Sequence, residues 1–134
     1  MWTPYEQIRG HRADFRVRYL LYDQAEGGRR LPPRQGYRCD FAYAEDGEEG
    51  MQLYGIHPEF EDGKGEILMD GTAPVPTEGT ARMWVLFPEM RRSVHAKRIR
   101  PGVRGFFMEG PRRLGEVEVL DVIDLAENAE RIGD

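Results

Sequence analysis

A run of basic side chains between residues 91 and 104 has the clearest potential for chemistry in this sequence. The run contains no acidic residue, and with two arginines that follow it the basic set comprises Arg91, Arg92, Lys97, Arg98, Arg100, Arg104, Arg112 and Arg113. Guanidinium groups bind carboxylates and phosphates through paired hydrogen bonds, so an exposed basic loop predicts binding of an anion or an acidic partner. The run has no aromatic residue, which gives no support for stacking on single-stranded bases. The alternative is a solvated loop that pairs with the acidic segment of the same molecule.

Carboxylates gather in that acidic segment, at Glu45–Glu49, with Glu59, Glu61 and Asp62 beyond it. A calcium loop needs oxygen ligands at the spacing D-x-[DN]-x-[DN]-G, which is missing. The three histidines have no metal-type spacing to one another or to Cys39. We therefore expect no metal site and a solvated negative surface. The alternative is a mimic of nucleic-acid phosphates or a docking face for a basic partner.

Few residues are placed for catalysis. Cys39 alternates with Tyr37 and Phe41, which predicts a core residue and not a nucleophile. The only serine, Ser93, lacks a G-x-S-x-G context, and no GxxxxGK[ST] loop is present to hold phosphates. The sequence predicts no enzymatic activity, no cofactor and no nucleotide.

One aromatic residue is a candidate interface anchor. In the run Thr80–Phe87, Trp84 lies on the face opposite Met83 and Val85, together with Arg82. If this face is exposed, Trp84 and Arg82 form a grouping common at protein interfaces. The alternative is that both faces are buried, for example by a C-terminal helix.

Length and composition narrow the class of protein. The chain has 134 residues, which suits a single domain (residues 1–134), and its one cysteine excludes an internal disulfide. The longest apolar run, Met83–Phe87, is far shorter than the ~20 residues of a membrane span, so we expect a cytoplasmic protein with no membrane partner. The net charge of −5 is unlike that of a uniformly basic nucleic-acid binder. Its acidic and basic segments instead favour a surface with faces of opposite sign.

Short alternating runs separated by glycine and proline position these side chains. The pattern predicts strands at Ala13–Asp23, Tyr37–Ala44, Met51–Ile56, Glu66–Asp70, Thr80–Phe87, Val103–Glu109 and Gly115–Ile123, with loops at His57–Gly65 and Pro88–Gly102. Asp124 and Glu127 have capping-box spacing, and Leu125, Ala129 and Ile132 then form an apolar stripe before Gly133. We predict an all-β fold: a small closed antiparallel barrel of about six to eight strands over residues 12–123, with a short helix or tail at 124–133.

The turns in this pattern have a distinctive order. The sequence Glu26-Gly27-Gly28-Arg29 precedes Gly36-Tyr37-Arg38, and Glu109-Gly110 later precedes Arg112-Arg113 and an alternating valine strand. This order resembles the C-terminal β-barrel, the third domain, of elongation factor Tu and related translational GTPases. The resemblance spans roughly Phe15 to Ile123. It implies a translation-factor-like barrel standing alone, with Gly27, Gly28, Arg29, Glu109 and Gly110 at the family's turn positions.

The departures from the family pattern bear on the partner. Asp40 stands where the family has a glutamine that approaches tRNA, and the following turn carries four carboxylates. Carboxylates repel phosphates, so the family's tRNA role is disfavoured. Pro111 also replaces a glycine in the second turn, which removes an N–H donor.

We therefore expect a non-catalytic binding module with a protein partner. One version is a decoy or immunity-type protein that competes with elongation factor Tu. The alternative is an accessory protein that binds RNA or tRNA through the basic loop 91–104.

Overall fold

The computed structural model describes residues 1–131. Its six strands are β1 (Phe15–Leu21), β2 (Asp40–Tyr43), β3 (Ile56–Phe60), β4 (Glu78–Val85), β5 (Arg104–Glu109) and β6 (Arg112–Val122). The helical elements are α1 (Tyr5–Arg9), α2 (Pro88–Met90), the π-helix η3 (Arg91–His95), α3 (Ala96–Arg98) and α4 (Leu125–Arg131), with 3-10 turns η1 (Gln24–Glu26) and η2 (Ala44–Asp46). The predicted all-β character is confirmed, apart from these short helices.

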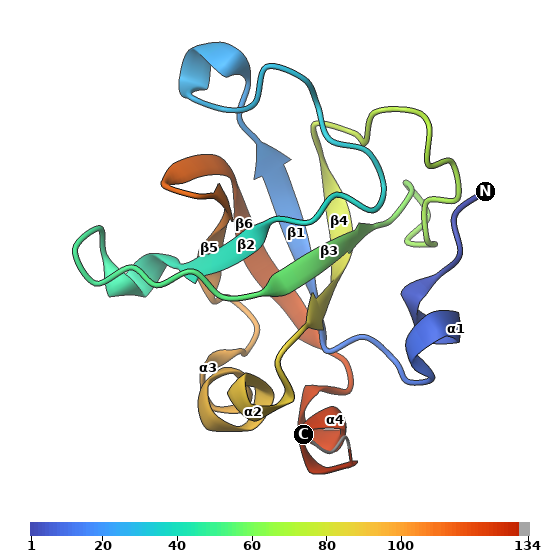
Figure 1. Cartoon of the computed structure of the whole chain (residues 1–134), viewed down its shortest axis with the longest axis vertical. Coiled ribbons are helices and arrows are strands. Elements are labelled where there is room, and N and C mark those ends of the chain that lie inside the picture. Colours follow the sequence, from blue (N-terminus) through green and yellow to red (C-terminus); the bar gives the residue numbers. More distant parts are fainter. Residues whose placement is uncertain (132–134) are drawn as a thin grey trace.

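All six strands form one antiparallel sheet in the order β2-β5-β6-β1-β4-β3, which curls into a half-barrel (Figure 1). The prediction of a closed barrel is wrong. The two edge strands, β2 and β3, approach each other only near the bridge that joins Phe41 to Tyr54. At Phe60 of β3, the Gln35 side chain hydrogen-bonds both the backbone N–H and the C=O in place of a neighbouring strand. Pro58 offers no N–H at this edge. At Phe60 the edge of β3 is thus hydrogen-bonded without a further strand.

The core follows the period of two that the sequence shows. Phe15, Val17, Tyr19 and Leu21 of β1 all point inward and are buried. Tyr19 packs edge-on against Phe60, with ring centroids 5.2 Å apart. Burial of these large apolar side chains supplies the main driving force for folding.

Two predictions near β3 are wrong. The strand begins at Ile56 and runs through residues assigned to a loop, whereas Glu66–Asp70 contributes only an isolated bridge from Ile67 to Glu61. The acidic residues of this segment led to the loop prediction, since charged side chains are usually exposed. In the structure, Glu59 and Glu61 are instead buried, and their carboxylates accept hydrogen bonds from N–H donors. Carboxylates paired in this way can lie within a strand.

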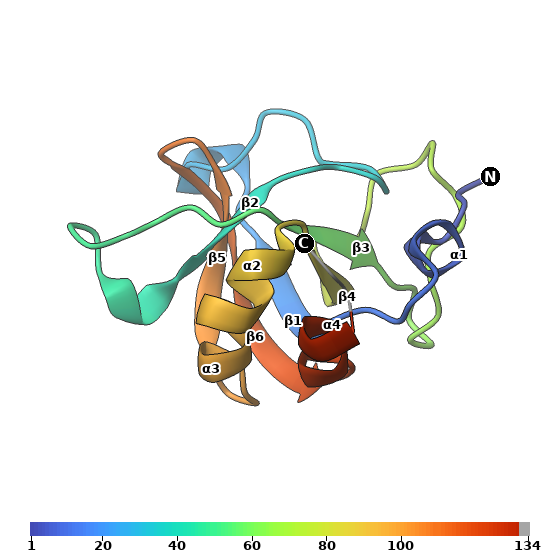
Figure 2. The same ribbon diagram turned by 60° about the horizontal axis from the view of Figure 1, so that its bottom comes forward.

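The half-barrel has two ends with different coverings. At the lower mouth, where β1 begins and β4 ends, the helical segment α2–η3–α3 and helix α4 close the opening (Figure 2). At the upper mouth, where β1 ends at Leu21, the loop through residues 22–39 lies over the core (Figure 1), and Val75 and Thr77 from the segment before β4 line the same opening. The segment Pro88–Arg98 was predicted as a loop and is helical.

Helix α4 confirms the predicted C-terminal helix over Leu125–Arg131, with Leu125 and Ala129 buried. The predicted positions Ile132 and Gly133 lie outside the described residues. Within residues 1–131, every helix is too short or too polar to cross a bilayer.

Candidate binding site at the upper mouth

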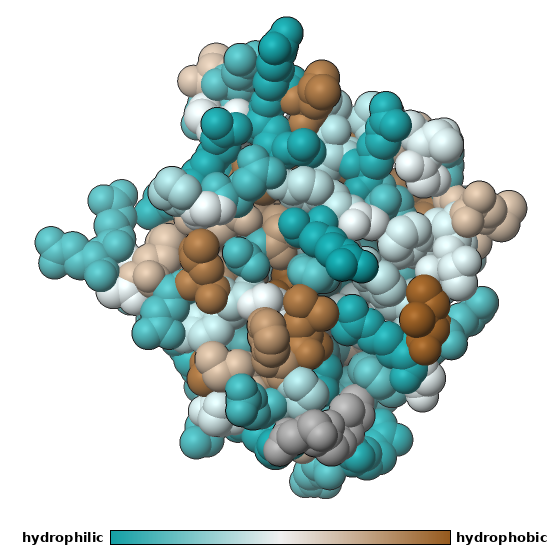
Figure 3. All heavy atoms as spheres, in the orientation of Figure 1, coloured by the Kyte–Doolittle hydropathy of each residue, from teal (hydrophilic) through white to brown (hydrophobic). Residues whose placement is uncertain are grey.

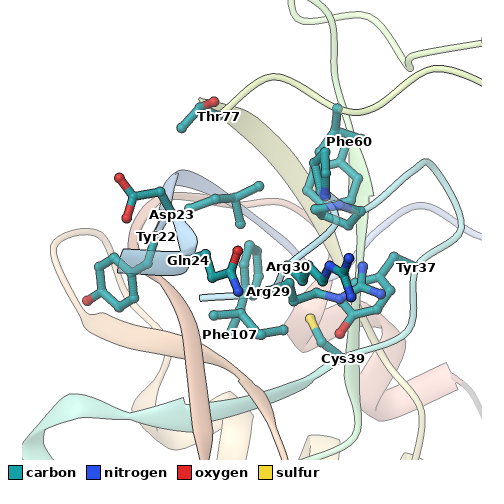
Figure 4. Close-up of a pocket in the computed structure, with 15 residues that line it drawn as sticks. Tyr22, Asp23, Gln24, Arg29, Arg30, Tyr37, Cys39, Phe60, Thr77 and Phe107 are labelled. Carbon is teal, nitrogen blue, oxygen red and sulfur yellow. The ribbon is translucent and has the colours of Figure 1, made fainter. Parts of the chain in front are cut away.

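An apolar cavity of about 230 Å³ lies at the upper mouth (Figure 4). Its base is apolar and is drawn from the ends of the strands and the loops between them: Leu21, Pro33, Cys39, Phe60, Val75, Phe107 and Leu114. The polar side chains lie at the rim: Tyr22, Asp23, Gln24, Arg29, Arg30, Tyr37 and Thr77. An apolar base with a few polar groups at the rim is the usual composition of a site that binds a small ligand.

Local sequence explains why the covering loop turns back over the sheet. Asp23 and Glu26 form a capping box, in which the Asp23 carboxylate accepts from the Glu26 N–H at 2.8 Å. Gly27 then has φ +96°, and a Cβ on Gly28 would lie 2.2 Å from the Tyr22 carbonyl oxygen. These two glycines permit the tight return that brings Arg29 and Arg30 to the rim.

Arg29, Tyr37 and Glu109 form a cluster at one side of the rim. The Arg29 guanidinium lies 4.5 Å from the Tyr37 ring centroid and 3.6 Å from the Glu109 carboxylate. The Tyr37 hydroxyl donates to the same carboxylate. Burial, followed by this hydrogen bond, raises the pKa of Tyr37. The neutral phenol, the form present at pH 7, is the form that donates this hydrogen bond to Glu109.

Arg30 differs from its neighbour. Its side chain is exposed, and within residues 1–131 it has no hydrogen bond or ion pair. Figure 4 shows Arg29 and Arg30 together on the Tyr37 side of the cavity, with Tyr22 and Asp23 on the opposite side. The rim thus offers one unpaired positive charge next to the apolar base.

Cys39 lies in the base of the cavity and is 5% exposed. Burial is the main cause that raises the pKa of its thiol, with the Asp40 charge adding to it. A neutral thiol is a poor nucleophile, so Cys39 contributes to packing. This agrees with its predicted place in the core.

The turn residues singled out from the sequence meet at this site. Arg29 from the first turn contacts Glu109 from the second, and Gly27 and Gly110 both have positive φ. The cavity and the place of Arg30 at its rim were not predicted, although the adjacent pair Arg29-Arg30 before two prolines was a visible signal. The apolar base could not be found from the sequence because its residues come from distant segments.

The basic set is dispersed by the fold. Arg91, expected in an exposed loop, is 2% exposed and donates to the Asp14 carboxylate at 2.9 Å. Arg98 makes hydrogen bonds to Glu45 and Asp46, the shortest at 2.6 and 2.8 Å, and its guanidinium lies 3.7 Å from the Tyr43 ring centroid.

The other basic side chains lie at the surface. Arg104 is 3.8 Å from Glu118, Arg112 is 3.9 Å from Glu109, and Arg113 is 3.5 Å from Glu48. Arg92, Lys97 and Arg100 are exposed. Arg98 and Arg113 therefore pair with carboxylates of the acidic segment Glu45–Glu49, as the alternative interpretation of the sequence expected for the basic loop. Of the basic set, Arg91 is buried and is therefore not presented to a partner.

Trp84 and Arg82 are engaged within the molecule. Trp84 is 1% exposed, and its indole N–H donates to Glu59 at 3.1 Å. The covering comes from the N-terminal segment, since Tyr5 and His11 pack on the Trp84 ring, and not from helix α4. Arg82 donates to the buried Glu61 at 2.9 Å. The Trp84 ring is thus not available as a surface anchor.

The molecular surface gives little sign of a broad apolar interface on the face shown in Figure 3, where hydrophilic residues separate small apolar patches. Among the described residues, no group of three or more His, Cys, Asp or Glu side chains could hold a metal ion. Neither a scan against protein-family models nor a search of curated proteins finds a match to this chain.

Proposed function

We propose that this chain is a non-catalytic binding module whose recognition site is the upper mouth of the half-barrel. The observation that carries the proposal is the apolar cavity of about 230 Å³ at this mouth. An apolar cavity of about 150 Å³ is enough to hold benzene, so this one has room for a ring with a short chain. The ligand would place such an apolar group against Phe60, Phe107 and Leu114.

The chemistry of the buried groups supports binding over catalysis. Cys39 carries a neutral thiol. The buried carboxylates of Asp14, Glu59 and Glu61 each accept hydrogen bonds from two or more side chains or backbone N–H groups. Their oxygens are occupied by bonds within the fold, which leaves these carboxylates poorly placed to contact a substrate.

Two hypotheses from the sequence retain less support. Recognition of RNA or of an acidic protein through residues 91–104 would require a basic surface, yet Arg91 is buried and Arg98 is already paired with Glu45 and Asp46. A protein partner remains compatible with the upper mouth, provided that it presents an apolar group to the cavity.

We also retain, as a proposal, the relationship to the third domain of elongation factor Tu. It is supported by the order of the two glycine turns and by the contact between Arg29 and Glu109, which joins them. The proposed site does not depend on this relationship.

The proposal is tested by ligand-induced stabilisation with a neutral probe, 3-phenylpropan-1-ol, whose ten non-hydrogen atoms suit the cavity. A ligand that binds only the folded state raises the melting temperature in proportion to its occupancy. We expect a rise in the wild type and none in Val75→Trp, whose larger side chain fills the cavity. An equal rise in both proteins, or none in either, would overturn the proposal.

A further inference from the structure

We infer that the upper mouth selects an amphipathic anion: a carboxylate attached to an apolar body of about ten non-hydrogen atoms or fewer. The inference rests on the proposed function and adds the charge of the ligand. It is carried by the position of Arg30, an arginine without a partner in the described chain, at the rim of an apolar cavity.

The charges around the rim leave Arg30 uncompensated. Glu109 already interacts with Arg29, with Arg112 and with the Tyr37 hydroxyl. Among the described residues, Asp23 is the one acidic residue that lines the cavity itself, and its carboxylate accepts a hydrogen bond from the Glu26 N–H. Figure 4 shows the Asp23 carboxylate pointing away from the arginines. The acid on the Arg30 side of the rim, Glu109, is thus already bound by other groups, and an anion there would meet an Arg30 guanidinium that has no partner within residues 1–131.

The base of the cavity sets the place of the anionic group. Phe60, Val75, Phe107 and Leu114 offer no charged or strongly polar atom, and the Cys39 thiol is neutral. A carboxylate pushed into this base would lose its hydration without a partner, which is strongly unfavourable. The anionic end must stay at the rim, where the Arg30 guanidinium can donate two parallel hydrogen bonds to it.

Two kinds of ligand carry a carboxylate attached to an apolar group. One is a free small-molecule carboxylate with an aromatic or aliphatic body. The other is the C-terminal carboxylate of a peptide that ends in an apolar residue, in which the last side chain fills the cavity. Both place a carboxylate a few atoms from an apolar group, and both require Arg30.

The experiment compares 3-phenylpropanoate with 3-phenylpropan-1-ol by titration calorimetry against the wild type, Arg30→Gln and Arg34→Gln. The two probes share one body and differ in charge. Arg34 is a matched control, because it is exposed and close in sequence but does not line the cavity. Arg30 is exposed and makes no hydrogen bond or ion pair within residues 1–131, so circular dichroism of Arg30→Gln should match that of the wild type.

We expect the wild type to bind the carboxylate at least about fivefold more tightly than the alcohol, since a charge-assisted hydrogen bond replaces a neutral one. This preference should fall to about one in Arg30→Gln, persist in Arg34→Gln and weaken with salt. Equal binding of both probes to the wild type would overturn the inference and leave the proposed function standing. Binding of neither probe would overturn both.

N-acetyl-phenylalanine and its neutral amide distinguish the two sources of the carboxylate. Tighter binding of N-acetyl-phenylalanine than of 3-phenylpropanoate, with no binding of the amide, supports a peptide C-terminus. The reverse order supports a free small carboxylate. If the amide binds as tightly as the acid, the requirement for a carboxylate is wrong.

Discussion

The two mouths of the half-barrel use arginine in opposite ways. At the lower mouth, Arg91 is buried, and its guanidinium donates to Asp14 and to the Val85 carbonyl, each at 2.9 Å. At the upper mouth, Arg30 is exposed and unpaired within the described chain. The first arginine has its hydrogen bonds within the fold, whereas the second has its donors available for a ligand.

We therefore assign the lower mouth to the stability of the fold and the upper mouth to the proposed recognition of a ligand. Asp14 also accepts from Asn128 at 2.9 Å and from the Val85 N–H at 2.8 Å, so one carboxylate joins β1, β4, the helical segment and α4. No comparable buried ionic network is found at the upper mouth among residues 1–131, where the chain instead leaves a cavity. Substitutions at the lower mouth should therefore unfold the protein, and those at the upper mouth should alter binding.

The largest effect is expected for Asp14→Ala. It leaves the Arg91 charge buried without its partner, which typically costs about 3–5 kcal/mol. Urea denaturation followed by circular dichroism measures the loss. The control is Arg18→Ala, which removes an exposed pair with Glu118 and should change the free energy of unfolding by less than about 1 kcal/mol. Similar losses in the two variants would contradict the assigned role of the lower mouth.

The second effect concerns pH and His95, which is 1% exposed at the lower mouth. Burial lowers its pKa to about 4, and Nδ1 shares a 2.6 Å hydrogen bond with the Tyr43 hydroxyl. Between this value and the unfolded pKa of about 6.5, the unfolded chain binds more protons, so stability falls as pH falls.

We expect a loss of roughly 2 kcal/mol from this group between pH 6.5 and pH 5, measured by denaturation at each pH. His95→Phe should reduce the slope. His57, whose pKa is also lowered mainly by burial, contributes a residual slope of the same sign. An unchanged slope in His95→Phe would show that His95 is not the group responsible.

The third prediction compares one substitution at both mouths. Val75→Trp, at the cavity, should change the free energy of unfolding by less than about 1 kcal/mol, because the new ring enters existing space. Val85→Trp, in the packed lower mouth, should destabilise by about 3 kcal/mol, because no space is available. Equal losses from thermal unfolding of the two variants would indicate that the upper cavity cannot accept a ring.

The smallest effect is expected for Tyr37→Phe. The ring remains under Arg29, and only the exposed hydrogen bond to Glu109 is lost, at a cost of about 1 kcal/mol or less. The change is measured by urea denaturation. A loss as large as that of Asp14→Ala would mean that the upper rim is also a structural network.

The sequence predicted the parts of the fold that depend on local pattern. Alternation located β1, β2, β4, β5 and β6 to within a few residues, because one face of each strand is buried. Charge composition was a poor guide elsewhere. The basic run around Arg91 is helical and not an exposed loop, and Arg91 is buried because Asp14, distant in sequence, accepts its guanidinium. The acidic residues Glu59 and Glu61 lie in or beside β3 for the corresponding reason.

The candidate site was predictable only in part. The two glycine turns were recognised, and the structure brings Arg29 and Glu109 together. The cavity itself depends on Phe60, Val75 and Leu114 meeting across the curled sheet. The open edge between β2 and β3 likewise depends on Gln35 capping Phe60, a contact that no local pattern reveals.

The most direct test of the central claim is a titration with 3-phenylpropan-1-ol followed by methyl resonances in ¹H–¹³C NMR spectra. If the upper mouth is the recognition site, the methyl groups of Leu21, Val75 and Leu114 shift with a common saturation curve. Those of Val85 and Leu125 at the lower mouth stay in place. Shifts confined to the lower mouth, or no shifts at saturating probe, would contradict the account.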